Sequence, residues 1–294
     1  MPTFRIATAL LLCGTAAAHA QQFQQIQPVI DRPLTLPYRA VDVTLHGTYT
    51  NWVPDGSNSA DGETLAFGVD FGATDRIQLG LATVLPVNPG AAFGSVLGSA
   101  MIATPSSTAA LRVDFGYENY GVNGNNSALF NHLNRFFGGF GAPLKIPITP
   151  TLAFVSGRSG AVQFGHFNNI GSSGTGVYSG ASQFTETSSD FLVVSGGDGG
   201  TILGINLPAG LLLQPDPHFA ITFQAGYSTI IDTDSSGSLH FIPVGLEGIL
   251  TPVPRLDIGA RFFIDGKVAE TGNVALGAGY FDLRELMFWT RVHL

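Results

Sequence analysis

Apolar and polar residues alternate along most of the chain beyond residue 40. In residues 256–263 (LDIGARFF) the even positions hold Leu, Ile, Ala and Phe, while the odd positions begin with Asp, Gly and Arg. Successive side chains of a β-strand point to opposite faces, so this period of two predicts a strand with one apolar face. Residues 241–250 alternate similarly, and residues 251–254 (TPVP) join the two segments. Proline fixes φ and lacks a backbone donor, so the joint predicts a β-hairpin with a short turn.

The hairpin pattern occurs five times. Its copies lie at residues 66–85, 98–117, 140–156, 209–227 and 241–263, with tight turns near 73–75, 104–105, 149–150, 215–217 and 251–254. Longer connections rich in Gly, Ser, Asn, Asp and Thr lie at residues 87–91, 121–134, 168–197, 232–237 and 265–273. Short turns at one end and long loops at the other are typical of an up-and-down antiparallel β-barrel that spans an outer membrane.

The number of strands follows from these hairpins. With a first strand at residues 41–51 and a last strand at about 280–294, they predict an all-β transmembrane barrel of twelve strands, with ten or fourteen as alternatives. The seventh strand is the weakest, because Ser156 and Arg158 fall on its apolar parity, and we expect a bulge or an early exit near Gly157. A soluble secreted β-sandwich is the rival fold, but its outward face should be polar.

The amino terminus has the features of a secretory signal peptide. Arg5 precedes an apolar run at residues 7–12, and small residues follow up to Ala20, which predicts cleavage after Ala20. Acylation of Cys13, as in a lipoprotein, is disfavoured because the preceding Leu12 is not small. We therefore divide the chain into a signal peptide (1–20), an extended periplasmic leader (21–40) and the barrel (41–294). The Gln-rich and Pro-rich leader either forms a periplasmic tail or enters the lumen.

Composition excludes several functions. Charged residues make up 12% of the sequence and apolar residues 45%, yet no run after residue 12 reaches the roughly 20 apolar residues of a membrane helix. A net charge of −8 with only two lysines argues against nucleic acid as a partner. The part after residue 20 has no His-x-Ser pair, G-x-S-x-G elbow, H-E-x-x-H or Walker loop, so we expect no enzyme, cofactor or metal site. The run 196–200, with the single carboxylate of Asp198, is interpreted as a flexible loop rather than a calcium site.

Over about residues 41–294 the chain resembles Gram-negative outer-membrane β-barrel proteins of the porin-like or small-channel kind. The resemblance depends on the signal peptide, the repeated hairpins and the terminal strand 285–294 (ELMFWTRVHL). Such barrels usually end on an aromatic residue with a Gly a few positions before it, whereas this chain has Leu294 and Trp289 there. The resemblance implies outer-membrane lipid, the barrel-assembly machinery and small solutes as partners.

The side chains that alternate with the apolar ones along each strand are expected to line the lumen. They carry charges of both signs, and the lumen-lining candidates are Asp70, Arg112, Asp114, Lys145, Glu247, Arg261, Glu285 and Arg291. Glu247, Arg261 and Glu285 fall on three neighbouring strands, where opposite charges can pair across the ladder. They form either a structural ion pair or a constriction that selects solutes.

The sequence therefore predicts a channel for passive or facilitated diffusion of small solutes. The alternative is a structural or surface-recognition barrel with a blocked lumen, which acts through external loops such as residues 168–197. An outer-membrane hydrolase is a third possibility, disfavoured by the missing motifs. We also expect Ile258→Asp, on the lipid face, to impair membrane assembly, and Gly259→Asp to be better tolerated.

Overall fold

The computed structural model describes residues 25–53, 60–88, 95–120, 133–156, 190–197, 200–232, 237–271 and 282–294. Their strands are β1 (Val41–Val53), β2 (Ala60–Thr74), β3 (Ile77–Asn88), β4 (Ser95–Ala103), β5 (Ala110–Tyr120), β6 (Leu133–Gly141), β7 (Leu144–Thr149), β8 (Leu152–Ser156), β9 (Asp190–Gly197), β10 (Gly200–Asp216), β11 (Phe219–Asp232), β12 (Gly237–Val253), β13 (Leu256–Thr271) and β14 (Asp282–His293). No helix among the described residues is long and apolar enough to cross a membrane.

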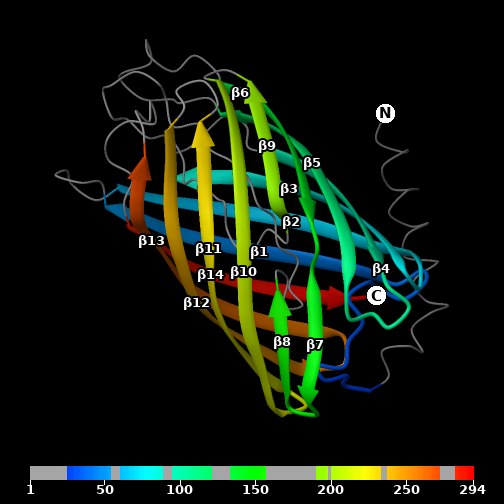
Figure 1. Ribbon diagram of the computed structural model, residues 1–294. Helices are drawn as coiled ribbons and strands as arrows, with labels where there is room; N and C mark the ends of the chain where they lie inside the picture. The colour runs from blue at the N-terminus through cyan, green and yellow to red at the C-terminus, as the bar shows by residue number, and fades with distance from the viewer. Residues whose placement is uncertain are drawn as a thin grey trace, which may run out of the picture.

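All fourteen strands belong to one antiparallel sheet, which curves into a barrel (Figure 1). β14 pairs with β1, and β10 pairs with β11, so the pairings run round the molecule as a circuit. The described strands form one continuous sheet, whereas a β-sandwich has two packed sheets, so the rival fold is wrong. The chain has the up-and-down architecture of outer-membrane β-barrels.

The sheet has more strands than the twelve predicted because one side of the barrel is interrupted. Ala142 and Pro143 separate β6 from β7, while β8 and β9 lie one after the other along β10. β8 pairs with Gly210–Leu213 and β9 with residues 200–205. β8 ends at Ser156, as expected for an early exit, and Gly157 and Arg158 lie outside the described residues.

The five predicted tight turns are confirmed, and two predicted loops are wrong in part. Residues 190–197 form β9, and residues 265–271 extend β13 as the partner of β12. Ladder hydrogen bonds use the backbone, so polar side chains do not end a strand. The rest of the predicted loop 168–197, residues 168–189, lies outside the described residues.

The outer face of the sheet is apolar and the inner face is largely polar. On β13, Ile258 and Phe262 are 41% and 47% exposed, whereas Asp257 and Arg261 between them are buried. Exposed Leu, Val, Ile and Phe side chains occur in the same alternation around the sheet. An apolar outer surface of this extent fits hydrocarbon rather than water, as in a barrel that crosses a bilayer.

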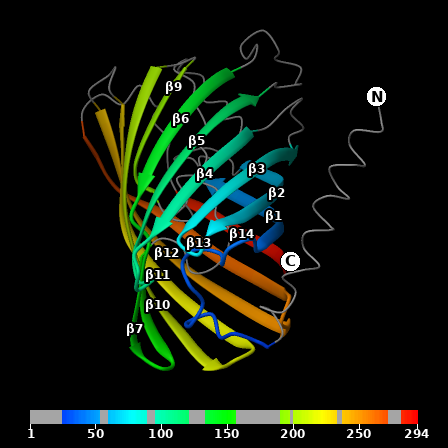
Figure 2. The same cartoon turned by 90° about the vertical axis from the view of Figure 1, so that its right-hand side faces the viewer.

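Residues 25–40, the described part of the leader, lie at the barrel end that carries the tight turns (Figure 2). We call this end the mouth. Backbone hydrogen bonds tie the end of the leader to the β2–β3 hairpin, from Arg39 N to Gly72 O at 2.7 Å and from Gly72 N to Ala40 O at 2.9 Å. A Cβ on Gly72 would lie 1.9 Å from the carbonyl oxygen of Pro37, so this close approach requires glycine.

Candidate functional site

All eight predicted lumen-lining residues lie on the inner parity of their strands. Seven have exposed fractions of 8% or less, and Asp114 is more open. They do not form one group. Glu247, Arg261 and Glu285 come together on adjacent strands, and the others lie in separate clusters around the wall.

The group formed by Glu247, Arg261 and Glu285, which we call the wall cluster, spans β12, β13 and β14. Arg261 Nη2 donates to Glu285 Oε1 at 2.5 Å, and both side chains are buried. Glu247 is the cross-strand partner of Arg261 in the ladder. Two carboxylates and one guanidinium therefore lie on adjacent strands of the inner wall, as the strand order predicts, and Glu285 forms the ion pair with Arg261.

Trp289 completes the wall cluster. Its indole Nε1–H donates to Glu247 Oε1 at 3.2 Å, and the ring lies over the Cα of Gly259. The sequence pattern placed Trp289 at the usual glycine position of the terminal strand without assigning it to the lumen. Its parity, shared with Glu285 and Arg291, was the available signal.

A second group, the mouth cluster, joins the leader to the wall. It consists of Arg32, Asp42, Asp257, Arg291 and His293. His293 stands between two carboxylates, with Nδ1 2.6 Å from Asp42 Oδ1 and Nε2 2.9 Å from Asp257 Oδ2. A doubly protonated imidazole would donate to both.

Arg32 is the leader's contribution to this cluster. Its Nη1 and Nη2 donate to the two oxygens of Asp257 at 2.5 and 3.0 Å, and Nη2 also donates to Thr251 Oγ1 at 3.0 Å. Sequence reasoning missed Arg32 and His293 as site residues. The flanking Val292 and Leu294 set the inward parity of His293, whereas no periodic pattern indicated where Arg32 lies.

Arg291 links the two clusters. Its guanidinium lies 5.4 Å from the centre of the Trp289 ring, and its Nε is 3.7 Å from Asp42 Oδ2. A cation over an indole face gains a modest electrostatic attraction. One polar stripe therefore runs from the mouth to the wall cluster.

The remaining candidates make local contacts elsewhere on the inner wall. Gln78 Nε2 donates to Asp70 Oδ1 at 2.8 Å, and Arg112 donates to both oxygens of Asp114 at 2.6 and 2.7 Å. Lys145 Nζ donates to the leader carbonyls of Val29, at 3.0 Å, and Arg32. Lys145 is thus a leader contact as well as a wall residue.

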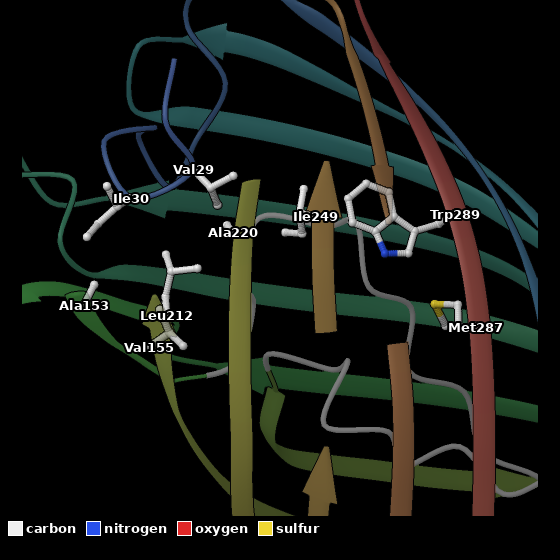
Figure 3. Packing of buried hydrophobic residues seen from close by; sticks show 9 residues of the cluster. All are labelled: Val29, Ile30, Ala153, Val155, Leu212, Ala220, Ile249, Met287 and Trp289. Atoms are coloured by element: carbon white, nitrogen blue, oxygen red, sulfur yellow. The ribbon is translucent and has the colours of Figure 1, made fainter. Parts of the chain in front are cut away.

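Part of the inner wall is apolar, contrary to a strict division of the two parities. Val29 and Ile30 of the leader pack against it (Figure 3). We call this surface the apolar seat, and it consists of Ala153, Val155, Leu212, Ala220, Ile249, Met287 and Trp289. The leader covers these side chains, which explains why residues such as Leu212 and Ile249 face inward.

Several buried polar atoms on the inner wall have no hydrogen-bond partner among the described residues. They include Thr44 Oγ1, Thr222 Oγ1 and both amide atoms of Gln224. Buried polar groups need a partner, which water or a polar solute supplies when protein does not. No group of three His, Cys, Asp or Glu in the described ranges could hold a metal ion.

One serine and one histidine lie in hydrogen-bonding contact at the far end of β12. Ser238 Oγ is 3.0 Å from His240 Nε2, and His240 Nδ1 is 2.5 Å from Tyr227 Oη. Ser238 Oγ also lies 2.5 Å from Thr271 Oγ1. A hydroxyl beside an imidazole is one element of acyl-transfer sites, which additionally need aligned oxyanion donors. These contacts join the hydroxyl groups of Ser238, Thr271 and Tyr227 and the imidazole of His240 into one hydrogen-bonded cluster at the end of β12.

No known family profile matches the chain, and no curated protein sequence matches it. Among solved structures, the chain is similar to the COG4313 outer membrane channel from Pseudomonas putida F1, with a TM-score of 0.48, 11% identity, and coverage of 90% of this chain and 98% of that one. The NanC porin gives a TM-score of 0.45 at 7% identity, with 85% and 98% covered. The KdgM porin gives 0.39 at 8% identity, with 84% and 98% covered.

Proposed function

We propose that this protein is an outer-membrane channel through which small solutes diffuse passively or by facilitated diffusion. The observation that carries the proposal is the contrast between the two faces of one sheet. Lipid-compatible Ile258 and Phe262 point outward while charged Asp257 and Arg261, on the same strand, point inward. A barrel with polar groups inside and apolar groups outside can hold a water-filled path across a bilayer.

Buried polar groups support a wet interior. The amide of Gln224 and the hydroxyl of Thr222 lack protein partners among the described residues, and desolvating them without partners would be costly. Water inside the barrel meets this requirement. The wall cluster then places fixed charge beside the path, where charged side chains set ion and solute preference.

The proposed location is the outer membrane. Cleavage after Ala20 would export the chain, the barrel-assembly machinery would insert it, and outer-membrane lipid would surround the apolar face. These two partners are part of the proposal, together with the small solutes. Cell fractionation and amino-terminal sequencing of the mature chain would test it, with Gln21 as the expected first residue.

The second candidate is a structural or surface-recognition barrel with a blocked lumen, and the position of the leader favours it. Residues 29 and 30 are buried inside the mouth, where they narrow any path. Planar-bilayer recordings separate the two functions. Discrete conductance steps from the folded protein support a channel. A folded protein that gives no steps, with the leader bound or released, supports the blocked barrel.

A further inference from the structure

The leader crosses the mouth from one side of the barrel to the other. Ile30 N donates to Gln214 Oε1 of β10 at 3.4 Å, and Lys145 of β7 donates to the Val29 carbonyl. Leu34 packs against Met101, Ala103 and Ala110, which belong to β4 and β5. Arg32 also binds Asp257 of β13, which lies across the barrel from β4 and β5, so strands far apart around the barrel contact the same ten residues of leader, 25–34.

The contacts at the two ends of the leader differ in kind. Residues 35–40 are anchored to the β2–β3 hairpin by backbone and side-chain bonds, including Leu36 N to Gln78 Oε1 at 3.0 Å and Tyr38 N to Asp75 Oδ1 at 2.9 Å. Residues 25–34 are in no strand, so their departure would break no ladder hydrogen bond of the barrel. The anchored end would keep a departed leader tethered.

Besides the contacts of Gln214, Lys145 and Leu34, two side-chain interactions hold residues 25–34 in place. Val29 and Ile30 fill the apolar seat, with exposed fractions of 2% and 3%. Arg32 forms a bidentate ion pair with Asp257, a geometry that favours arginine over lysine. The Arg32 side chain is 16% exposed, so water reaches the guanidinium and can replace the carboxylate.

We propose that residues 25–34 form a releasable stopper that closes the mouth while it occupies a peptide-binding site on the inner wall. This inference rests on the proposed channel function. The site takes a peptide in which two branched apolar residues lie in a turn and are followed, two positions later, by arginine: the seat binds the apolar pair and Asp257 binds the guanidinium. Leaving the site, the stopper swings on its anchored end and opens the path.

A labelling experiment tests release without relying on conduction. Cys13 is the only cysteine of the sequence. A Cys13→Ser, Ile30→Cys chain carries one thiol inside the seat, where cysteine packs as a small apolar side chain. We expect a water-soluble maleimide to label it about tenfold faster when Arg32→Ala is added. Arg255→Ala, on the exposed β12–β13 turn at the same end, is the matched control and should leave the rate unchanged.

Single-channel recording tests closure. The open probability of Arg32→Ala should exceed that of the unsubstituted chain by about tenfold, and Arg32→Lys should fall between them. A synthetic peptide of residues 25–40, added to the Arg32→Ala protein, should restore the closed state. The same peptide with alanine in place of Arg32, and Arg39 kept, should not.

The outcomes separate the stopper from the channel. Equal labelling rates with and without the Arg32 side chain would show that its ion pair with Asp257 does not hold the stopper in place, whether or not the protein conducts ions. Faster labelling with unchanged, measurable conductance overturns the stopper and leaves the channel intact. Faster labelling of proteins that are all folded and silent contradicts the channel function itself and, with it, closure of a path. Faster labelling, higher open probability and sequence-dependent block by the peptide together support the proposal.

Discussion

Arg32 and Asp257, 225 residues apart in the sequence, join the leader to the barrel wall through two contacts of 2.5 and 3.0 Å. The carboxylate also accepts from Thr251 at 2.6 Å and lies 2.9 Å from His293 Nε2. Asp257 of β13 is therefore shared by three groups, from the leader, the end of β12 and β14. Removing the Asp257 carboxylate and removing the Arg32 guanidinium leave different groups without a partner.

Asp257→Ala should destabilise the folded barrel more than Arg32→Ala. Removing the carboxylate leaves Arg32 without its acceptor and His293 with Asp42 alone, and breaking a buried pair this way costs about 3–5 kcal/mol. Removing the Arg32 side chain leaves Asp257 with Thr251 and His293, so we expect a loss below about 1 kcal/mol. Urea unfolding in detergent micelles measures both. Equal losses would contradict the assignment of Asp257 as the centre of the mouth cluster.

Gly259→Ala should destabilise the barrel. An added Cβ would lie 2.0 Å from the Trp289 ring, and overpacking of this kind costs about 1–3 kcal/mol. The expectation that Gly259→Asp is better tolerated than Ile258→Asp stays a prediction, although the Trp289 ring leaves little room for a side chain at residue 259. Gly248→Ala is the control, since its Cβ would meet only Phe219, at 3.9 Å.

Trp289→Leu should rescue Gly259→Ala, since the smaller side chain leaves room for the added methyl group. A double-mutant cycle on unfolding free energies measures the coupling. Additive losses would mean that Trp289 does not cover Gly259. Ile258→Asp stays a prediction of impaired assembly, because Ile258 is exposed on the apolar outer face.

Glu285→Gln should shift ion selectivity toward anions. The substitution removes one of the two carboxylates beside Arg261 and keeps a side-chain oxygen that can accept the 2.5 Å hydrogen bond. The reversal potential in a salt gradient gives the sign of the change. Glu63→Gln, on the exposed parity of β2, is the control of equal charge. Identical shifts from both variants would show that net charge, and not the wall cluster, determines selectivity.

Ser238→Ala should leave both conductance and lipid composition unchanged. Ser238 and His240 are in contact at 3.0 Å, but the account gives them a structural role at the strand end. Fatty-acid release from phospholipid vesicles containing the folded protein is the measurement. Release above background that disappears in Ser238→Ala would contradict a protein without hydrolase activity.

The sequence predicted the features that depend on period and strand order. Alternation located the strands and tight turns, and adjacency brought Glu247, Arg261 and Glu285 together. It could not predict where a non-periodic segment would pack, so the docking of Arg32 and the covering of Leu212 and Ile249 were missed. The sequence predicted the early end of β8 near Gly157, but not the break at Pro143, because the residues on both sides of that proline still alternate as a strand does.

Planar-bilayer conductance of the folded protein, recorded for the unsubstituted chain beside Arg32→Ala, tests whether the barrel is a channel. We expect discrete steps, with the Arg32→Ala protein open for the larger fraction of time. No steps from either protein, when both migrate as folded barrels in heat-modifiability gels, would contradict the channel.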